Sequence, residues 1–102
     1  MFINVINSYR DVIAVCDNEI LGKRFEEQSG KNVRQLDVKE SFYRGEEVPE
    51  EKAIHIMKKF AKEDATFNIA GHASVTAAIK AGVISKESIG KIQGIPFALV
   101  LL

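Results

Sequence analysis

Two stretches of the chain are apolar at every position, residues 12–16 (VIAVC) and residues 97–102 (FALVLL). Strands without polar alternation are typical of the interior of a sheet, where both faces are covered. Residues 2–8 also form a strand-like segment, and the short polar connection Tyr9-Arg10-Asp11 predicts a hairpin between them and residues 12–16. We therefore expect two interior strands, one of them joined to an N-terminal strand by a short turn.

Helical spacing of apolar residues predicts two helices in the second half of the chain. Pro49 suits the first turn of a helix, because its missing N–H is not needed there, and the helix that it opens extends over residues 49–64. Its apolar stripe consists of Ala53, Ile54, Met57, Phe60 and Ala61. A second helix is predicted over residues 73–81, between Gly71 and Gly82.

Shorter elements connect these strands and helices. Asp17 is placed to cap a short helix over residues 18–21, which Gly22 ends. Further predicted features are, in chain order, a mostly charged segment over residues 23–31 with a turn at Ser29-Gly30, a more exposed strand over residues 33–38, a turn over residues 42–47 centred on Gly45, a strand over residues 65–70 and a single helical turn from Ser85 to Ile89. The resulting order, β-β-α-β-α-β-α-β, favours one mixed sheet of four or five strands with two or three packed helices. The expected class is α+β, with α/β as the neighbouring label.

The composition limits what such a domain can do. A chain of 102 residues is long enough for a single domain over residues 1–102 and too short for two domains with adequate cores. Fourteen basic and fourteen acidic residues give a net charge of zero, so the molecule lacks the charge excess of proteins that bind nucleic acid unselectively. A site for a polyanion must therefore be a local patch, and no binding to DNA is predicted.

Cysteine usage and the apolar runs favour an intracellular protein. Cys16 is the one cysteine, so no intramolecular disulfide can form, which fits a reducing compartment. The N-terminal residues lack the pattern of a signal peptide, and the longest apolar run, residues 95–102, is far shorter than a bilayer requires. We expect a cytoplasmic protein without a membrane partner.

Several stretches of the chain are similar to one family of proteins. The most characteristic is residues 14–23 (AVCDNEILGK), and the other similar segments are residues 41–43 (SFY), Gly45-Glu46, Val48, residues 68–71 (NIAG), Ala78-Ile79, residues 82–84 (GVI) and residues 92–96 (IQGIP). Together they resemble the archaeal "domain of unknown function 424" proteins over nearly the whole chain. The resemblance implies an archaeal, cytoplasmic, stand-alone domain that is associated with the translation machinery. It identifies no catalytic residue.

The helix predicted over residues 49–64 carries the sharpest candidate binding site. At about 100° per residue, five side chains fall opposite its apolar stripe: Lys52, His55, Lys58, Lys59 and Lys62. Lys58 and Lys62 lie one turn apart and repel each other by roughly a few tenths of a kcal/mol, so stability alone does not explain the pair. A face of this kind suits the phosphates of RNA or of a ribonucleoprotein. The alternative is an ordinary solvated surface, diluted by Glu51 and Glu63.

A second candidate is an anion site where the predicted strand over residues 65–70 leads into the next helix. Free amides and the positive end of the helix dipole attract anions at such a junction. Gly71 would let a ligand approach the backbone, and His72 and Ser74 could add hydrogen bonds. The alternative is that Gly71 only permits a tight turn between strand and helix.

A third candidate is catalytic and uses Cys16 with Asp17 and His72. A thiol near a helix N-terminus can have a lowered pKa and act as a nucleophile if a base lies within reach. A buried structural cysteine followed by a capping aspartate explains the same residues. No spacing of His, Cys or carboxylates predicts a metal site, and no cofactor is expected.

The two resulting hypotheses on function belong to different classes. The leading one is a non-enzymatic binding or accessory protein that acts on RNA or a ribonucleoprotein through the basic helix face. The alternative is a small ligand-binding domain or enzyme with its site near Cys16, Asp17 and His72. A convex lysine face favours the first, and a partly closed pocket around the three side chains favours the second.

Overall fold

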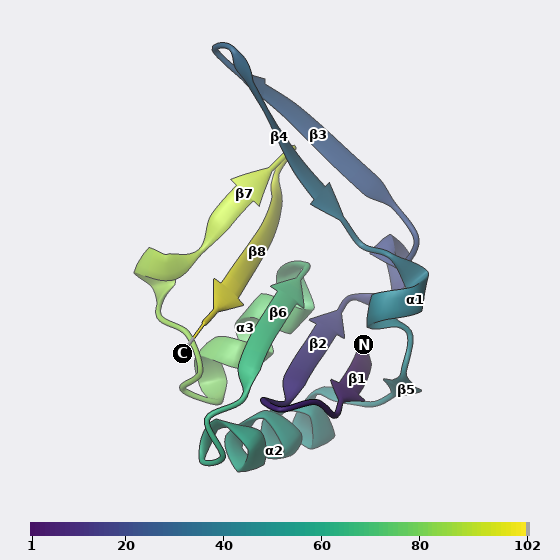
Figure 1. Cartoon of the computed structure of the whole chain (residues 1–102), viewed down its shortest axis with the longest axis vertical. Coiled ribbons are helices and arrows are strands. Elements are labelled where there is room, and N and C mark those ends of the chain that lie inside the picture. The colour runs from purple at the N-terminus through teal and green to yellow at the C-terminus, as the bar shows by residue number, and fades with distance from the viewer. Residues whose placement is uncertain (102) are drawn as a thin grey trace.

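The computed structural model describes residues 1–101, in which a mixed sheet forms the body of the molecule (Figure 1). Its elements are β1 (Phe2–Ile6), β2 (Val12–Cys16), η1 (Asn18–Ile20), β3 (Arg24–Ser29), β4 (Asn32–Asp37), α1 (Glu40–Tyr43), β5 (Glu46–Glu47), α2 (Glu50–Ala61), β6 (Thr66–Ala70), α3 (His72–Lys80), η2 (Lys86–Ser88), β7 (Gly90–Ile92) and β8 (Ile95–Val100). The strand order in the main sheet is β5-β1-β2-β6-β8-β7. Strands β3 and β4 form a separate hairpin that projects from the body. No helix in residues 1–101 is long and apolar enough to cross a membrane.

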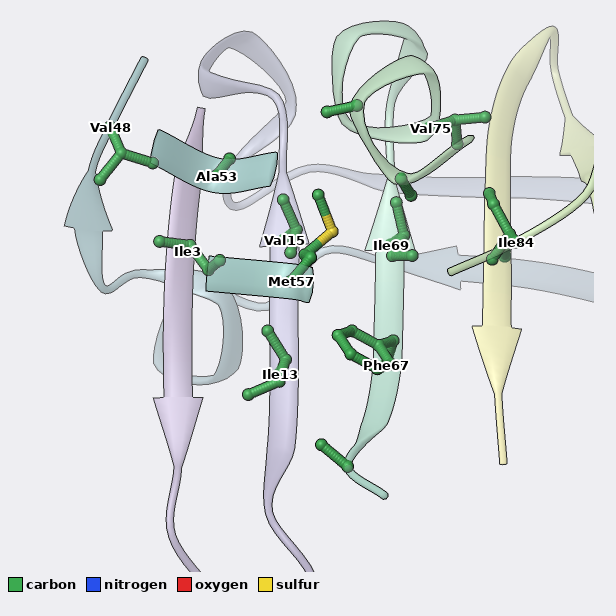
Figure 2. Packing of buried hydrophobic residues seen from close by; sticks show 14 residues of the cluster. Ile3, Ile13, Val15, Val48, Ala53, Met57, Phe67, Ile69, Val75 and Ile84 are labelled. Atoms are coloured by element: carbon green, nitrogen blue, oxygen red, sulfur yellow. The ribbon is translucent and has the colours of Figure 1, made fainter. Parts of the chain in front are cut away.

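Helices α2 and α3 cover one face of this sheet. Alternate residues of a strand point to the same side, so Ile13 of β2 and Phe67 and Ile69 of β6 all face the helices. Ala53 and Met57 of α2 are completely buried. Figure 2 shows them lying over the side chains of these strands. Ile54 and Phe60 of the predicted apolar stripe also pack against this core, whereas Ala61, predicted as part of the stripe, is exposed.

The opposite face of the sheet is covered by shorter elements. Cys16 and Ala70 lie there with side chains from η1, the base of the β3–β4 hairpin and α1. The covering residues with the least exposure are Ile20, Leu36, Val38 and Tyr43. The lysine-bearing helix α2 and this second cluster thus lie on opposite sides of the sheet.

The interior strands predicted from their uniform apolar character are confirmed. Strand β2 lies between β1, to which it is antiparallel, and β6, to which it is parallel. Strand β8 lies between β6 and β7, which pairs only with the first half of β8, and Leu99 near the end of β8 is 54% exposed. Residue 102 of the predicted strand falls outside the described residues. The α+β class is also confirmed, with six strands in the main sheet instead of the four or five expected.

Two local predictions are corrected by the structure. The charged segment over residues 23–31 contains strand β3, whose one largely apolar side chain, Phe25, is paired with Leu36 while its charged neighbours face solvent. The turn predicted over residues 42–47 is instead the end of α1 followed by β5, which pairs with β1. Gly45 is tightly enclosed there, because a Cβ on it would lie 2.2 Å from the carbonyl oxygen of Ile3.

Candidate functional site

The basic face predicted on α2 exists as one continuous exposed surface. His55, Lys58, Lys59 and Lys62 are all exposed and line a shallow hollow of about 340 Å³ on the outer side of the helix. Their spacing of three, four and seven residues places them on one stripe, which extends roughly 10 Å along the axis at about 1.5 Å per residue. This surface, defined by these four residues, is called the lysine face below.

Charge pairing divides α2 into two halves. At its N-terminal end, Lys52 bonds to Glu46 at 2.6 Å and Glu50 accepts a bond from Lys80 of α3 at 2.9 Å. At the other end, Lys58 and Lys62 have no carboxylate within ion-pairing distance among residues 1–101. Lys52, predicted as part of the basic face, is therefore neutralised locally, and the positive charge is concentrated on the lysine face.

The position of the lysine face at the C-terminal end of α2 reduces the loss of stability caused by repulsion among its lysines. Lys58 and Lys59 lie in the last turn of α2, and Lys62 is its C-cap. The negative end of the helix dipole lies there and attracts cations, which offsets the repulsion between the lysines. Lys59 additionally lies over the ring of Phe60, 5.6 Å from its centroid.

The second candidate, the anion site at the start of α3, is occupied by a carboxylate of the chain itself. The carboxylate of Asp17 accepts hydrogen bonds from the amides of Ala73 (3.0 Å) and Ser74 (2.8 Å) and from the Ser74 hydroxyl (2.7 Å). Asp17 and Ser74 are buried. Gly71 permits the close approach, since a Cβ on it would lie 2.3 Å from the carboxyl carbon of Asp17. These groups therefore serve as an internal helix cap, and His72 is exposed beside them.

The cap that Asp17 makes differs from the one predicted. The sequence places it directly before the short helix over residues 18–21, but η1 has no side-chain cap hydrogen bond from Asp17. Its carboxylate instead reaches α3, 57 positions along the chain from Ser74. Parallel pairing of β2 with β6 brings the two segments together, because both strands end at the same edge of the sheet.

The environment of Cys16 indicates a structural role for this residue. Cys16 is completely buried, and burial followed by the charge of Asp17 raises the thiol pKa to about 12. The hydroxyl pKa of neighbouring Tyr43 is raised to about 12 as well, mainly by burial. A thiol that stays protonated at neutral pH is a poor nucleophile. Cys16 is buried and Asp17 is engaged as a cap, so His72 is the one member of the predicted trio that is exposed to solvent.

A polar hollow next to the lysine face was missed by sequence reasoning. It measures about 470 Å³ and is lined by the β1–β2 connection and the segment after α2, specifically Ser8, Tyr9, Arg10, Asp11, Glu63 and Asp64. Tyr9 projects fully into solvent. The signal that could have found it is an aromatic residue within an otherwise polar turn. Among residues 1–101, no cluster of three or more His, Cys, Asp or Glu side chains is arranged to hold a metal ion.

Comparison with known proteins yields a family and a fold. The family described as "Protein of unknown function (DUF424)" matches residues 6–102. An uncharacterised conserved protein from Methanopyrus kandleri has a similar crystal structure, with a TM-score of 0.82 and 23% sequence identity. The similarity covers 97% of this chain and 88% of that one. Among curated proteins, none matches the chain.

Proposed function

The chain belongs to the DUF424 family of proteins of unknown function, and for this member we propose a non-enzymatic role in binding RNA through the lysine face of α2. The observation that carries the proposal is the hollow formed by three exposed lysines and His55, without a neighbouring carboxylate partner for Lys58 or Lys62 in residues 1–101. In a protein of zero net charge, such a concentration makes one surface attractive to a polyanion.

The chemistry of this surface suits phosphate more than carboxylate ligands of fixed geometry. Lysine ammonium groups act as point charges with rotatable donors, which accommodate successive phosphates along a flexible strand. The stripe of roughly 10 Å is long enough for about two or three backbone phosphates. A cytoplasmic accessory protein on RNA or a ribonucleoprotein is the role that follows.

The enzymatic alternative has less support. Cys16 is buried with a raised thiol pKa, and Asp17 is engaged with Ala73 and Ser74. A nucleophile requires an accessible thiolate, and a general base requires a free carboxylate or imidazole near it. The geometry around these residues favours stability of the fold over chemistry.

The proposal is tested by measuring binding of a fluorescent single-stranded RNA at low salt. The variant Lys58→Gln/Lys62→Gln removes two charges from the lysine face, and Lys86→Gln/Lys91→Gln removes two exposed lysine charges outside α2. We expect the first variant to bind about tenfold more weakly than wild type and the second to bind almost as well. Equal affinity of the two variants would show that the location of the charge does not matter and would contradict the proposal.

A further inference from the structure

The hollow beside the lysine face has a feature that the proposed RNA site does not use, the side chain of Tyr9. This tyrosine lies in the connection between β1 and β2, and its exposure equals that of a fully solvated residue. A ring of this size normally buries a large apolar area, so a fully exposed one is available to a partner. Tyr9 lines the hollow together with Glu63 and Asp64, which directly follow Lys62 in the chain.

The backbone around Tyr9 is held in place. The Ser8 hydroxyl donates to the carbonyl of Arg10 and braces the turn from within. The amide of Thr66 donates to the carbonyl of Asp11 at 2.9 Å, which fastens the turn to the segment after α2. An aromatic side chain has only two rotatable bonds, so stacking on it costs little conformational entropy when its backbone is fixed.

The two hollows differ in the sign of their charge. The hollow around Tyr9 is lined by three carboxylates, those of Asp11, Glu63 and Asp64, and by one guanidinium, that of Arg10. The negative charges outnumber the positive one, so the hollow as a whole repels phosphate. The lysine face next to it attracts phosphate. A nucleotide strand that crosses both is therefore oriented with its phosphates on the lysines and an uncharged base beside Tyr9.

We propose, on the basis of the function proposed above, that Tyr9 is a stacking platform for an unpaired base and that the site selects single-stranded over double-stranded RNA. Every base has a flat π-face, so an aromatic ring binds single strands with little dependence on sequence. In a duplex the bases are paired and stacked on one another, and Tyr9 has no base to contact. The lysines supply affinity for both forms, and Tyr9 supplies the preference.

Tyrosine emission gives a direct readout of this contact. The chain has two tyrosines and no tryptophan, and Tyr43 is buried in the cluster that contains Cys16. We expect a short oligouridylate to quench the emission of the wild-type protein, and the variant Tyr9→Phe to lose that quenching while it keeps its affinity within about twofold. Tyr9→Ala should bind the oligouridylate about tenfold more weakly and a short RNA duplex with unchanged affinity.

The variants separate this inference from the proposal on which it rests. If Tyr9→Ala binds oligouridylate like wild type while Lys58→Gln/Lys62→Gln binds weakly, the stacking role is wrong and the lysine face stands. If Tyr9→Ala weakens oligouridylate and duplex equally, the contact does not discriminate between the two forms and the inference is overturned. If the lysine variant binds both RNAs like wild type, the proposed function itself fails. Because Tyr9 is fully exposed, both variants at this position should fold normally, which thermal unfolding verifies.

Discussion

The start of α3 and the C-terminal half of α2 are both charged helix ends, and they differ in where the opposite charge comes from. At the start of α3, the carboxylate of Asp17 satisfies Ala73 and Ser74 from within the chain. At the end of α2, Lys58 and Lys62 have no such partner in residues 1–101. A charged group satisfied internally stabilises the fold, whereas a cluster without an internal partner is available to a ligand.

Removal of the internal anion should have the largest effect on stability. We expect Asp17→Ala to lower the free energy of unfolding by about 3 to 4 kcal/mol, because two amides and the buried Ser74 hydroxyl lose their acceptor. Asp17→Asn should cost roughly half as much, because one oxygen remains to accept. Urea unfolding measures both, with exposed Glu19→Ala as the matched control. A loss for Asp17→Ala no larger than that of the control would show that the cap is unimportant.

A side chain at Gly71, which would contact the same Asp17 carboxylate, should have the next largest effect on stability. A methyl group at Gly71 would lie 2.3 to 2.6 Å from the Asp17 carboxylate, on a backbone with φ of 108°. We expect Gly71→Ala to cost about 2 to 3 kcal/mol. Gly82 also has a positive φ but open space around it, so Gly82→Ala should cost only about 1 kcal/mol in the same urea titration. Equal costs would mean that the contact with Asp17 carries no energy.

Alkaline pH should weaken the side of the sheet that contains Cys16. The thiol pKa is about 12 in the folded protein, against an ordinary value of 9.0 for a solvated cysteine, so the folded form holds its proton more tightly than the unfolded chain does. The stability contributed by the buried thiol is therefore complete below pH 9.0 and falls as the pH rises from there towards 12, with Tyr43 contributing between 10.0 and 12. Cys16→Ala should cost about 1 to 2 kcal/mol at neutral pH and flatten this decline, which urea unfolding at a series of pH values measures.

Labelling kinetics provide an independent check on the same residue. A thiol reagent at neutral pH should modify Cys16 at the rate at which the protein opens, and rapidly once urea is added. Fast modification of the native protein would mean that the thiol is accessible, and the enzymatic alternative would regain support.

The sequence predicts an element well where its own residues show a regular apolar pattern. It predicts an element poorly where the element forms only by pairing with another strand. Strand β2 and helix α2 can be recognised from the sequence, because β2 is apolar at every position and the apolar residues of α2 recur at helical spacing. Strand β3 does not, since it faces solvent and is formed by pairing with β4. The direction of the lysine face follows from helical geometry alone.

The role of Asp17 could not be predicted from its neighbours in the chain. Its position before residues 18–21 indicates a local cap, but its partners are Ala73 and Ser74, 56 and 57 positions away. Only the parallel register of β2 with β6 places them together. Likewise, the hollow at Tyr9 arises from two turns that are distant in sequence and meet at one end of the sheet.

The salt dependence of RNA binding tests the contrast between the two helix ends most directly. If Lys58, Lys59 and Lys62 contact phosphates, the slope of log affinity against log salt for single-stranded RNA should be about −2. Lys58→Gln/Lys62→Gln should reduce its magnitude by roughly 1.4 while leaving the free energy of unfolding nearly unchanged, because both side chains are exposed. An identical slope for this variant and for wild type would contradict the account, because the lysines would then contact no phosphate.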